Sequence, residues 1–301
     1  MASTTKTSTT KASSTTKATT TAPATTAAPP AGITTALPAS AGYTALPTAS
    51  VITGSFDGKM VKFDRAGSSG DCQEQKETGE ADAVFILESG ASISNVIIGK
   101  AQAEGSNYAL EVFLATDIDR SYRYPLSWAV HRDKCLVGGR LRRCHYCVFL
   151  FPHCTAHALS SVTSQIKQTG SGDVSTINGG GAFHAEDKVV QHNGAGLVKI
   201  SNFFASDFGK LYRACGNCAT HYERHVQLSN VCLNSGKEGV GINSNWGDTA
   251  SLSGVKISGK PSAANVCCTY TGVNKGSEPP KIGCGDGYSA CQYSESSVGS
   301  C

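Results

Sequence analysis

Residues 228–233 read Leu-Ser-Asn-Val-Cys-Leu, and the same short pattern recurs along the chain. The other copies are Ile93-Ser-Asn95-Val-Ile-Ile, Ile200-Ser-Asn202-Phe-Phe and Leu252-Ser-Gly254-Val-Lys-Ile257. Each copy passes from an apolar residue through Asn or Gly into a second apolar run, which is typical of short strands joined by turns. Copies spaced by roughly one solenoid repeat predict stacked coils that bury a common core. We therefore expect an all-β, right-handed parallel β-helix; an antiparallel sandwich is the alternative that periodicity leaves open.

The N-terminal part of the chain has a different composition. Its first 50 residues are almost wholly Thr, Ser, Ala and Pro with a few Lys. Such a segment buries too little apolar surface to offset the entropy of an ordered chain. We predict a disordered Ser/Thr/Pro-rich stalk over residues 1–50 and one folded domain over residues 51–301, which we expect to be monomeric.

Composition also limits the compartment and the partners. No apolar run is long enough to cross a membrane, and no hydrophobic signal-peptide region follows Met1. Thirteen cysteines nevertheless favour a secreted protein in an oxidising compartment. We therefore favour a misplaced start codon over the alternative, a protein that does not use the usual secretion route. The net charge of +3 is too small to indicate a nucleic-acid partner.

Charged and polar side chains concentrate in three motifs of the second half. They are AFHAEDKVVQHNG at residues 182–194, FGKLYRACGNC at residues 208–218 and GINSNWGD at residues 241–248. In these motifs and their order the chain resembles the polysaccharide lyase family 3 pectate lyases of fungi, oomycetes and bacteria. The resemblance covers Phe56–Gly105 and Lys167–Ser297. It implies a parallel β-helix that cleaves polygalacturonate, the acidic polymer of pectin, by calcium-dependent β-elimination.

The resemblance also implies roles for individual residues. Lys188, in the AEDK motif, matches the base that removes the proton at C5 of galacturonate, and Arg213, in KLYR, matches the catalytic arginine. A lysine acts as a base only if its pKa is depressed, which neighbouring cations would achieve. Asp187 would support Lys188 or the metal. Lys210 and Arg224 are weaker candidates for binding the anionic sugar.

The expected cofactor is Ca²⁺, because the elimination builds negative charge beside a carboxylate that is already anionic. Calcium takes six to eight oxygen ligands, so a cluster of carboxylates is required. Glu104 matches a calcium-ligand position of the family. Two alternatives stay open: a galacturonan hydrolase, which needs two carboxylates flanking the bond, and a non-catalytic wall-binding solenoid. Glu186 and Asp187 fit a hydrolase poorly, because adjacent strand residues point to opposite faces.

Cysteines and histidines could imitate a metal site. The two Cys-x-x-Cys pairs, Cys144/Cys147 and Cys215/Cys218, lie too far apart for a zinc ribbon, and we expect Cys215 and Cys218 to be disulfide partners. Calcium prefers oxygen ligands, so structural or hydrogen-bonding roles are expected for the histidines of the motif region. These are His184, His192, His221 and His225.

Residues 106–165 interrupt the resemblance. They show no coil pattern and contain four cysteines, Cys135, Cys144, Cys147 and Cys154. Back-translation of Tyr124–Cys147 in a shifted frame permits IHCLGPCTVTNVWWEDVCEDAIT, which resembles the missing family segment. We therefore predict two translated introns here, with a genuine insertion as the alternative.

The frame shift would have chemical consequences. In the restored frame two Glu-Asp pairs would replace Gly138-Gly139 and Arg142-Arg143. The chain as written would then lack most of its calcium ligands and be weak or inactive. One coil would also be disordered or mispacked, because Leu136–Arg143 places arginines where a strand belongs.

Overall fold

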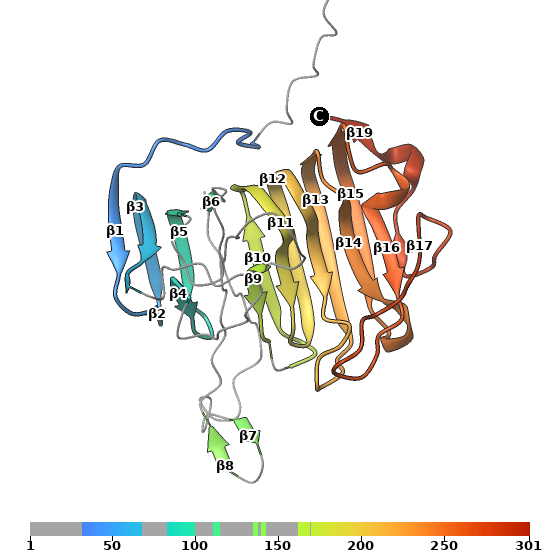
Figure 1. Ribbon diagram of the computed structural model, residues 1–301, viewed down its shortest axis with the longest axis horizontal. Helices are drawn as coiled ribbons and strands as arrows, with labels where there is room; N and C mark the ends of the chain where they lie inside the picture. Colours follow the sequence, from blue (N-terminus) through green and yellow to red (C-terminus); the bar gives the residue numbers. More distant parts are fainter. Residues whose placement is uncertain are drawn as a thin grey trace, which may run out of the picture.

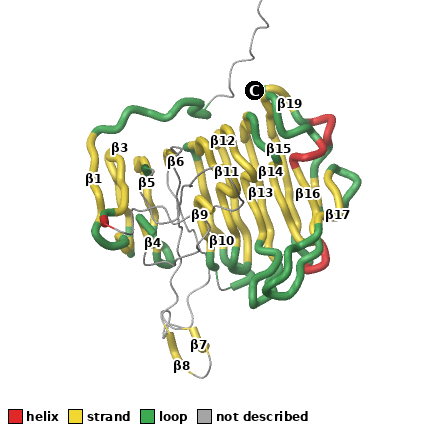
Figure 2. The backbone as a smooth tube through the Cα atoms, in the orientation of Figure 1, coloured by secondary structure: helices red, strands yellow, loops and turns green. Residues whose placement is uncertain are grey.

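A computed structural model describes residues 32–67, 83–99, 111–114, 135–137, 140–142, 162–168 and 170–301. In these ranges strands dominate, and helical structure is limited to short 3-10 turns (Figure 2). The turns are η3 (Ser244–Trp246), η4 (Ala264–Val266) and η5 (Glu295–Ser297). None of the helices described has the length and apolar character that a membrane span requires.

Fifteen strands form one curved sheet (Figure 1). Its main path runs through β1 (Gly42–Leu46), β3 (Ser55–Arg65), β5 (Ser92–Ile98), β6 (Glu111–Leu114), β11 (Gly181–His192), β12 (Gly196–Ala214), β13 (Arg224–Asn234), β15 (Thr249–Ser258) and β18 (Cys291–Gln292). Its branches are β9 (Val162–Ile166), β10 (Val174–Asn178), β14 (Glu238–Asn243), β16 (Cys267–Tyr270), β17 (Lys281–Cys284) and β19 (Gly299–Ser300). A second, small parallel sheet pairs β2 (Ser50–Ile52) with β4 (Phe85–Leu87).

The repeated Ser-Asn/Gly pattern marks one corner of each coil. Parallel pairing places Ser201 beside Ser229 and Ser229 beside Ser253 in successive coils. The residues that follow these serines, and Asn95, have left-handed backbones: φ is 52° at Asn95 and Asn202, 51° at Asn230 and 59° at Gly254. Asn and Gly tolerate this conformation, which explains their recurrence. The predicted parallel β-helix is confirmed, and the sandwich alternative is excluded.

A second left-handed corner lies a few residues further along each coil, and the sequence did not signal it. The backbone φ is 62° at His184, 54° at Asp207, 55° at Ser235 and 72° at Gly259. The His184 ring contacts the Asp207 carboxylate at 2.8 Å, so the corners of adjacent coils are also joined through side chains. Because these four residues differ in type, no repeated residue type in the sequence indicates the turn.

The core is a stack of equivalent apolar side chains from successive coils. Ile200 and Leu228 are each 1% exposed and Leu252 is 7% exposed, and the three are paired across β12, β13 and β15. At the N-terminal end of the described chain, Ile33 packs with Phe204 and Cys232. Non-adjacent parts of the sequence therefore share the apolar packing of the coils.

Folded structure begins earlier than residue 51. Strand β1 lies inside the predicted stalk and pairs in parallel with β3, from Gly42 beside Val61 to Leu46 beside Arg65. The prediction of disorder over the whole of residues 1–50 is therefore wrong for this strand. Composition did not reveal this strand, because it has only five residues and adjoins a long tract rich in Thr, Ala and Pro. Residues 1–31 lie outside the described part of the chain.

Three strands inside residues 106–165, β6, β7 (Cys135–Val137) and β8 (Arg140–Arg142), depart from the parallel coil architecture. β7 and β8 pair antiparallel with each other in a separate two-stranded sheet (Figure 1). β6 joins the large sheet, but it runs antiparallel to both of its neighbours, β5 and β11. These pairings agree with the prediction that Leu136–Arg143 does not supply a regular coil. Most of this segment lies outside the described residues.

Candidate active site

Charged side chains from successive coils form a row on one face of the helix. Lys188 of β11 pairs with Lys210 of β12, and Lys210 pairs with Glu238 of β14. Partners in register on parallel strands project to the same face, about 4.8 Å apart. Arg213 follows Lys210 by three residues. We call Lys188, Lys210 and Arg213 the cationic row.

Asp187 is part of the same site because the strand is irregular there. The register of β11 against β12 shifts between Ala185 and Lys188, and a bulge of this kind re-aims side chains. As a result Lys188 Nζ donates a hydrogen bond to Asp187 Oδ2, and the two side chains are only 18% and 15% exposed. The structure therefore brings together two of the predicted catalytic residues. The Glu186 side chain lies outside the described part of the chain.

Arg213 is held firmly, and all of its described hydrogen bonds leave from one nitrogen of the guanidinium. It is 6% exposed, and its Nη1 donates to the Ala214 carbonyl at 2.7 Å and to Asn243 Oδ1 at 3.0 Å. Its guanidinium carbon lies 4.1 Å from the centroid of the Tyr270 ring, within cation–π range. Among the described residues its hydrogen bonds all leave from Nη1. Nη2 is thus free to bind an anion.

Glu238 is the shared counter-ion of the site. It is 3% exposed, and its Oε2 accepts hydrogen bonds from the Tyr270 hydroxyl at 2.8 Å and Lys281 Nζ at 2.7 Å. Burial lowers the pKa values of Lys210 and Arg213, and the charge of Glu238 opposes that lowering. Burial and the same carboxylate raise the pKa of Tyr270, so this phenol stays protonated and donates. One carboxylate therefore interacts with three cations.

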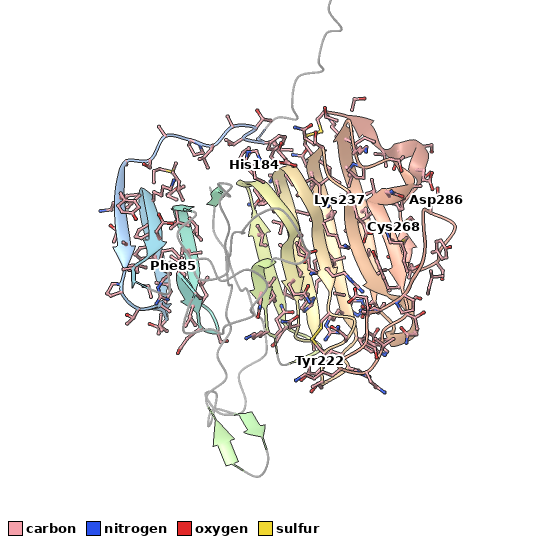
Figure 3. The ribbon with its side chains drawn as sticks, viewed as in Figure 1. Phe85, His184, Tyr222, Lys237, Cys268 and Asp286 are labelled. Atoms are coloured by element: carbon pink, nitrogen blue, oxygen red, sulfur yellow. A yellow bond between two sulfur atoms is a disulfide. The ribbon has the colours of Figure 1, made fainter. Side chains whose placement is uncertain are left out.

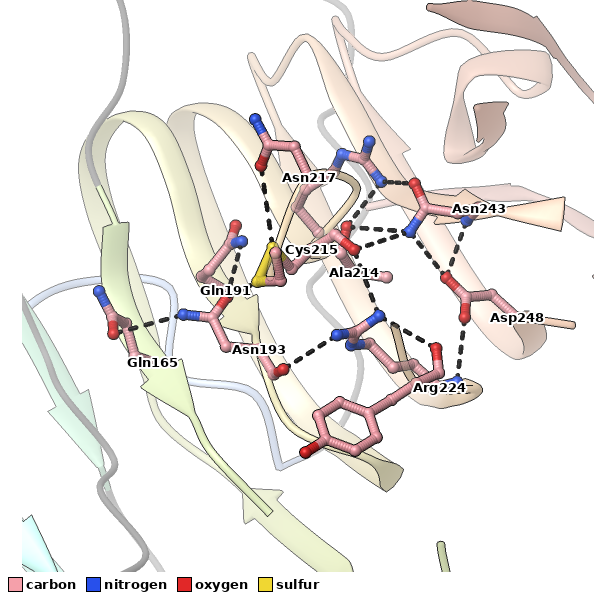
Figure 4. Close-up of a disulfide and its surroundings, with 12 residues drawn as sticks. Gln165, Gln191, Asn193, Ala214, Cys215, Asn217, Arg224, Asn243 and Asp248 are labelled. Carbon is pink, nitrogen blue, oxygen red and sulfur yellow. Dashed lines mark hydrogen bonds between the residues drawn. A yellow bond between two sulfur atoms is a disulfide. The ribbon is translucent and has the colours of Figure 1, made fainter. Parts of the chain in front are cut away.

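Arg224 does not lie at this surface. It is 0% exposed, and its Nη1 donates to the carbonyls of Cys215 at 3.2 Å and Tyr222 at 3.1 Å, while Nη2 donates to the carbonyl of Asn193 at 2.9 Å (Figure 4). A fully buried guanidinium with three backbone acceptors cannot reach a polymer. The prediction that Arg224 binds sugar is wrong: this side chain cross-links loops.

The GINSNWGD motif supplies the residues that surround Arg224. Asp248 is 1% exposed and accepts the backbone N–H groups of Arg224 at 3.0 Å and Asn243 at 2.8 Å, and the Asn243 amide at 2.9 Å (Figure 4). Burial raises the pKa of Asp248, and these hydrogen bonds oppose the rise. We call Arg224, Asn243 and Asp248 the buried corner network. Asn243 also accepts from Arg213, so it joins this network to the cationic row.

The Cys215–Cys218 disulfide closes the loop beside Arg213, as predicted, and excludes a zinc site there. Gly216, inside this loop, has no room for a side chain. A Cβ at that position would lie 2.7 Å from Arg213 Nη2 and 2.7 Å from Asn243 Oδ1. The other disulfides pair Cys232 with Cys301, Cys267 with Cys291, and Cys268 with Cys284.

The histidines have the structural roles that were expected. His192 is 0% exposed and lies between the Tyr212 hydroxyl at 2.8 Å and the Ala195 carbonyl at 3.1 Å. Burial lowers the pKa of His192 to about 3, so the ring is neutral at physiological pH. The remaining contacts are His184 with Asp207 at 2.8 Å, His225 with Thr249 Oγ1 at 2.7 Å, and His221 stacked on Trp246 at 4.0 Å.

The described carboxylates do not by themselves fit a calcium site. In these parts of the chain, no three His, Cys, Asp or Glu residues gather closely enough to hold a metal ion. Asp187 is engaged by Lys188, and Glu238 by Tyr270 and Lys281. Calcium requires six to eight oxygens, so further ligands would have to come from other residues. The predicted ligand Glu104 lies outside the described residues.

Comparisons with known sequences identify the family of the chain. A model of the pectate lyase family matches residues 34–111 and 160–277. A probable pectate lyase E of Neosartorya fischeri is 39% identical over 261 residues, which cover 86% of this chain and 84% of that protein. A probable pectate lyase F of Aspergillus terreus is 40% identical over 228 residues, 76% of this chain and 79% of that protein. The family match leaves residues 112–159 uncovered, within the interrupted segment.

Comparison with solved structures supports the fold. The catalytic domain of pectate lyase PelI from Erwinia chrysanthemi aligns with a TM-score of 0.52 at 20% identity, covering 84% of this chain and 98% of that one. PelI in complex with tetragalacturonic acid aligns with a TM-score of 0.50 at 21% identity, covering 83% of this chain and 69% of that one. Together with the family match, these likenesses show that the chain belongs to the pectate lyase family and is a polysaccharide lyase.

Proposed function

We propose that this chain binds polygalacturonate along the cationic row and cleaves it by calcium-dependent β-elimination, with Lys188 as the base. The observation that carries the proposal is the alignment of Lys188 beside Lys210 in register, with Arg213 stacked on Tyr270, whose hydroxyl donates to the register partner of Lys210, Glu238. Three cations on one face suit a polymer that carries a carboxylate on every sugar. The relative PelI was solved with tetragalacturonic acid, which is a fragment of such a polymer.

The chemical step assigned to Lys188 is a proton transfer. Its neutral amine takes the proton from C5, the C5–H electrons form a double bond between C4 and C5, and the C4–O4 bond breaks. The leaving oxygen takes a proton from solvent, and the new chain end carries an unsaturated sugar. Asp187 orients the amine through its hydrogen bond, and Nη2 of Arg213 binds the uronate carboxylate with a charge-assisted bond. The neutral form of Lys188 that the step requires stays a prediction.

Calcium, when bound, would neutralise the uronate charge that builds during the elimination. Since the described carboxylates alone do not form its site, Glu104 and acidic residues of the interrupted segment would complete it. In the chain as written, that segment carries Gly138-Gly139 and Arg142-Arg143 where the shifted frame encodes two Glu-Asp pairs. We therefore expect the unmodified chain to have weak lyase activity.

We also propose that the protein acts outside the cell as a monomer. Eight cysteines of the described chain form four disulfides, which persist in oxidising compartments. An extracellular compartment is also where a pectin-degrading lyase meets its substrate. Size-exclusion chromatography with light scattering measures the oligomeric state, and a dimer would contradict this part of the proposal.

The direct test is an assay on polygalacturonate that follows the ultraviolet absorbance of the unsaturated product during a calcium titration. The proposal expects slow, calcium-dependent growth of this absorbance with the unmodified chain, and none with Lys188→Ala. Release of reducing ends without absorbance and without calcium would indicate a galacturonan hydrolase instead. Retention of pectin with no product of either kind would indicate a wall-binding solenoid. Robust turnover by the unmodified chain would refute the account of residues 106–165.

A further inference from the structure

A hairpin at the C-terminal end of the helix carries one more cation to the site. Strand β17 runs antiparallel to β16, with Lys281 beside Tyr270 and Cys284 beside Cys268. The Cys268–Cys284 disulfide fixes this pairing. Cys268 is labelled among the C-terminal strands in Figure 3. Lys281 lies beyond residue 277, where the match to the family model ends.

Three contacts hold the Lys281 ammonium next to the cationic row. Its Nζ donates to Glu238 Oε2 at 2.7 Å and to Cys268 Sγ at 3.9 Å, and it lies 5.4 Å from the centroid of the Tyr270 ring. Glu238 is the register partner of Lys210, and the other contact of Tyr270 is Arg213. The ammonium therefore follows Lys188 and Lys210 in order along the helix.

The exposure of Lys281 distinguishes it from the groups that hold it. The Lys281 side chain is 45% exposed, whereas that of Glu238 is 3% exposed. An ammonium has three N–H donors, and here one is directed at Glu238 and one at Cys268 Sγ, 3.9 Å away. The third donor is left for a polymer on the cationic row.

We propose that Lys281 is a further substrate-binding residue, which binds the carboxylate of a galacturonate unit beyond those held by Lys188, Lys210 and Arg213. Glu238 and Tyr270 position its ammonium. The inference rests on the proposed function, because it assumes that an anionic polymer lies along this face. It adds that the binding surface continues onto the β16–β17 hairpin.

Binding of defined oligomers tests the proposal without requiring turnover. Calorimetric titration of the full chain with galacturonate trimers and hexamers compares the unmodified protein with Lys281→Met. A hexamer is long enough to contact the hairpin and the whole cationic row together, whereas a trimer can occupy the row without the hairpin, so the variant should bind the hexamer about fivefold more weakly and lose less affinity for the trimer. Lys281→Arg, which keeps the charge, should retain most of the hexamer affinity.

Two controls separate binding from structure. Lys199→Met removes an exposed lysine of β12 on the other side of the Asn202 and Asp207 corners, and it should leave both affinities unchanged. In the second control, Lys281→Met is added to the Glu238→Gln variant, so that the ammonium is removed without leaving a buried unpaired carboxylate. The double variant should bind the hexamer more weakly than Glu238→Gln does, by about the same factor that Lys281→Met causes in the unmodified chain. Equal hexamer affinity with and without Lys281 overturns the inference alone. An unmodified chain that binds neither oligomer overturns the proposed function as well.

Discussion

Two polar clusters lie on neighbouring strands, and each contains an arginine. The cationic row places Lys188 and Lys210 on a face of the helix, with hydrogen-bonding capacity left over at Arg213 Nη2. In the buried corner network, the Arg224 guanidinium meets three backbone carbonyls and is 0% exposed. Ammonium groups at a surface can bind a polymer, whereas a guanidinium that donates to backbone carbonyls in the interior makes a structural cross-link.

The comparison also identifies Asn243 as the link between the clusters. Its side chain accepts from Arg213 and donates to Asp248, so loss of order at the corner should reach the site. Damage to the row should leave the corner intact, because the row adds little to the packing of the coil. The predictions below use this asymmetry, in order of decreasing expected effect.

The largest effect should come from the segment that neither cluster contains. Replacing residues 106–165 by the segment encoded in the restored frame should raise the rate of polygalacturonate cleavage by about 1,000-fold. The gain corresponds to about 4 kcal/mol of transition-state stabilisation, within the range expected for a bound metal ion. The absorbance assay with and without a calcium chelator measures it. An equal rate before and after replacement would show that the written segment is a genuine, functional part of the protein.

Arg224→Met should cost about 3–5 kcal/mol of unfolding free energy, because three buried carbonyls lose their donor and Asp248 loses a nearby positive charge. Denaturant unfolding measures the loss. Lys210→Met, the matched change in the cationic row, should alter the unfolding free energy by less than about 1 kcal/mol. Similar losses for the two variants would remove the distinction between the clusters.

Acid should destabilise the fold through His192. Its folded pKa of about 3 is below the unfolded value of 6.5, so the unfolded state binds more protons between these pH values. The stabilisation is complete above pH 6.5 and is lost as the pH falls toward 3, by about 1.4 kcal/mol per pH unit. Asp248, whose pKa burial raises, acts in the opposite direction at the acid end. In His192→Gln the pH dependence from 7 to 4 should flatten; an unchanged slope would rule out His192 as its source.

Asn243→Ala should cost about 2 kcal/mol of unfolding free energy, since it removes side-chain hydrogen bonds to Arg213, Asp248 and the carbonyls of Ala214 and Cys215. It should also raise KM for polygalacturonate more than it lowers kcat, because Arg213 loses a contact that fixes its guanidinium. Steady-state kinetics on the restored chain separates the two constants. A variant with normal KM would show that the buried corner network does not support the row.

Much of this architecture was readable from the sequence, because the Asn202 and Asn230 corners repeat one residue type at equivalent positions. Their spacing of 28 residues (230 − 202) also equals that of Glu238 from Lys210 (238 − 210), so the counter-ion was predictable from the coil length. The burial of Arg224 was not, because it depends on how the loop at residues 215–223 folds back. From the sequence, Arg224 was a weaker candidate for binding the anionic sugar, which would place it at the surface. Only the hydrogen bonds of the folded chain show that it is buried.

The same limit applies to Asp187. An ideal strand would place it opposite Lys188, and the bulge that brings the two together has no sequence signal of its own. Residue types therefore predicted which side chains take part, whereas irregular backbone decided which of them meet.

The most direct measurement compares Lys188→Ala with the parent in a chain whose residues 106–165 are restored, by the initial rate of unsaturated-product formation. The account predicts a loss of about 1,000-fold, typical of removing a general base, with the melting temperature nearly unchanged and a much smaller loss of oligogalacturonate affinity. Turnover within a few-fold of the parent would contradict the assignment of Lys188 as the base.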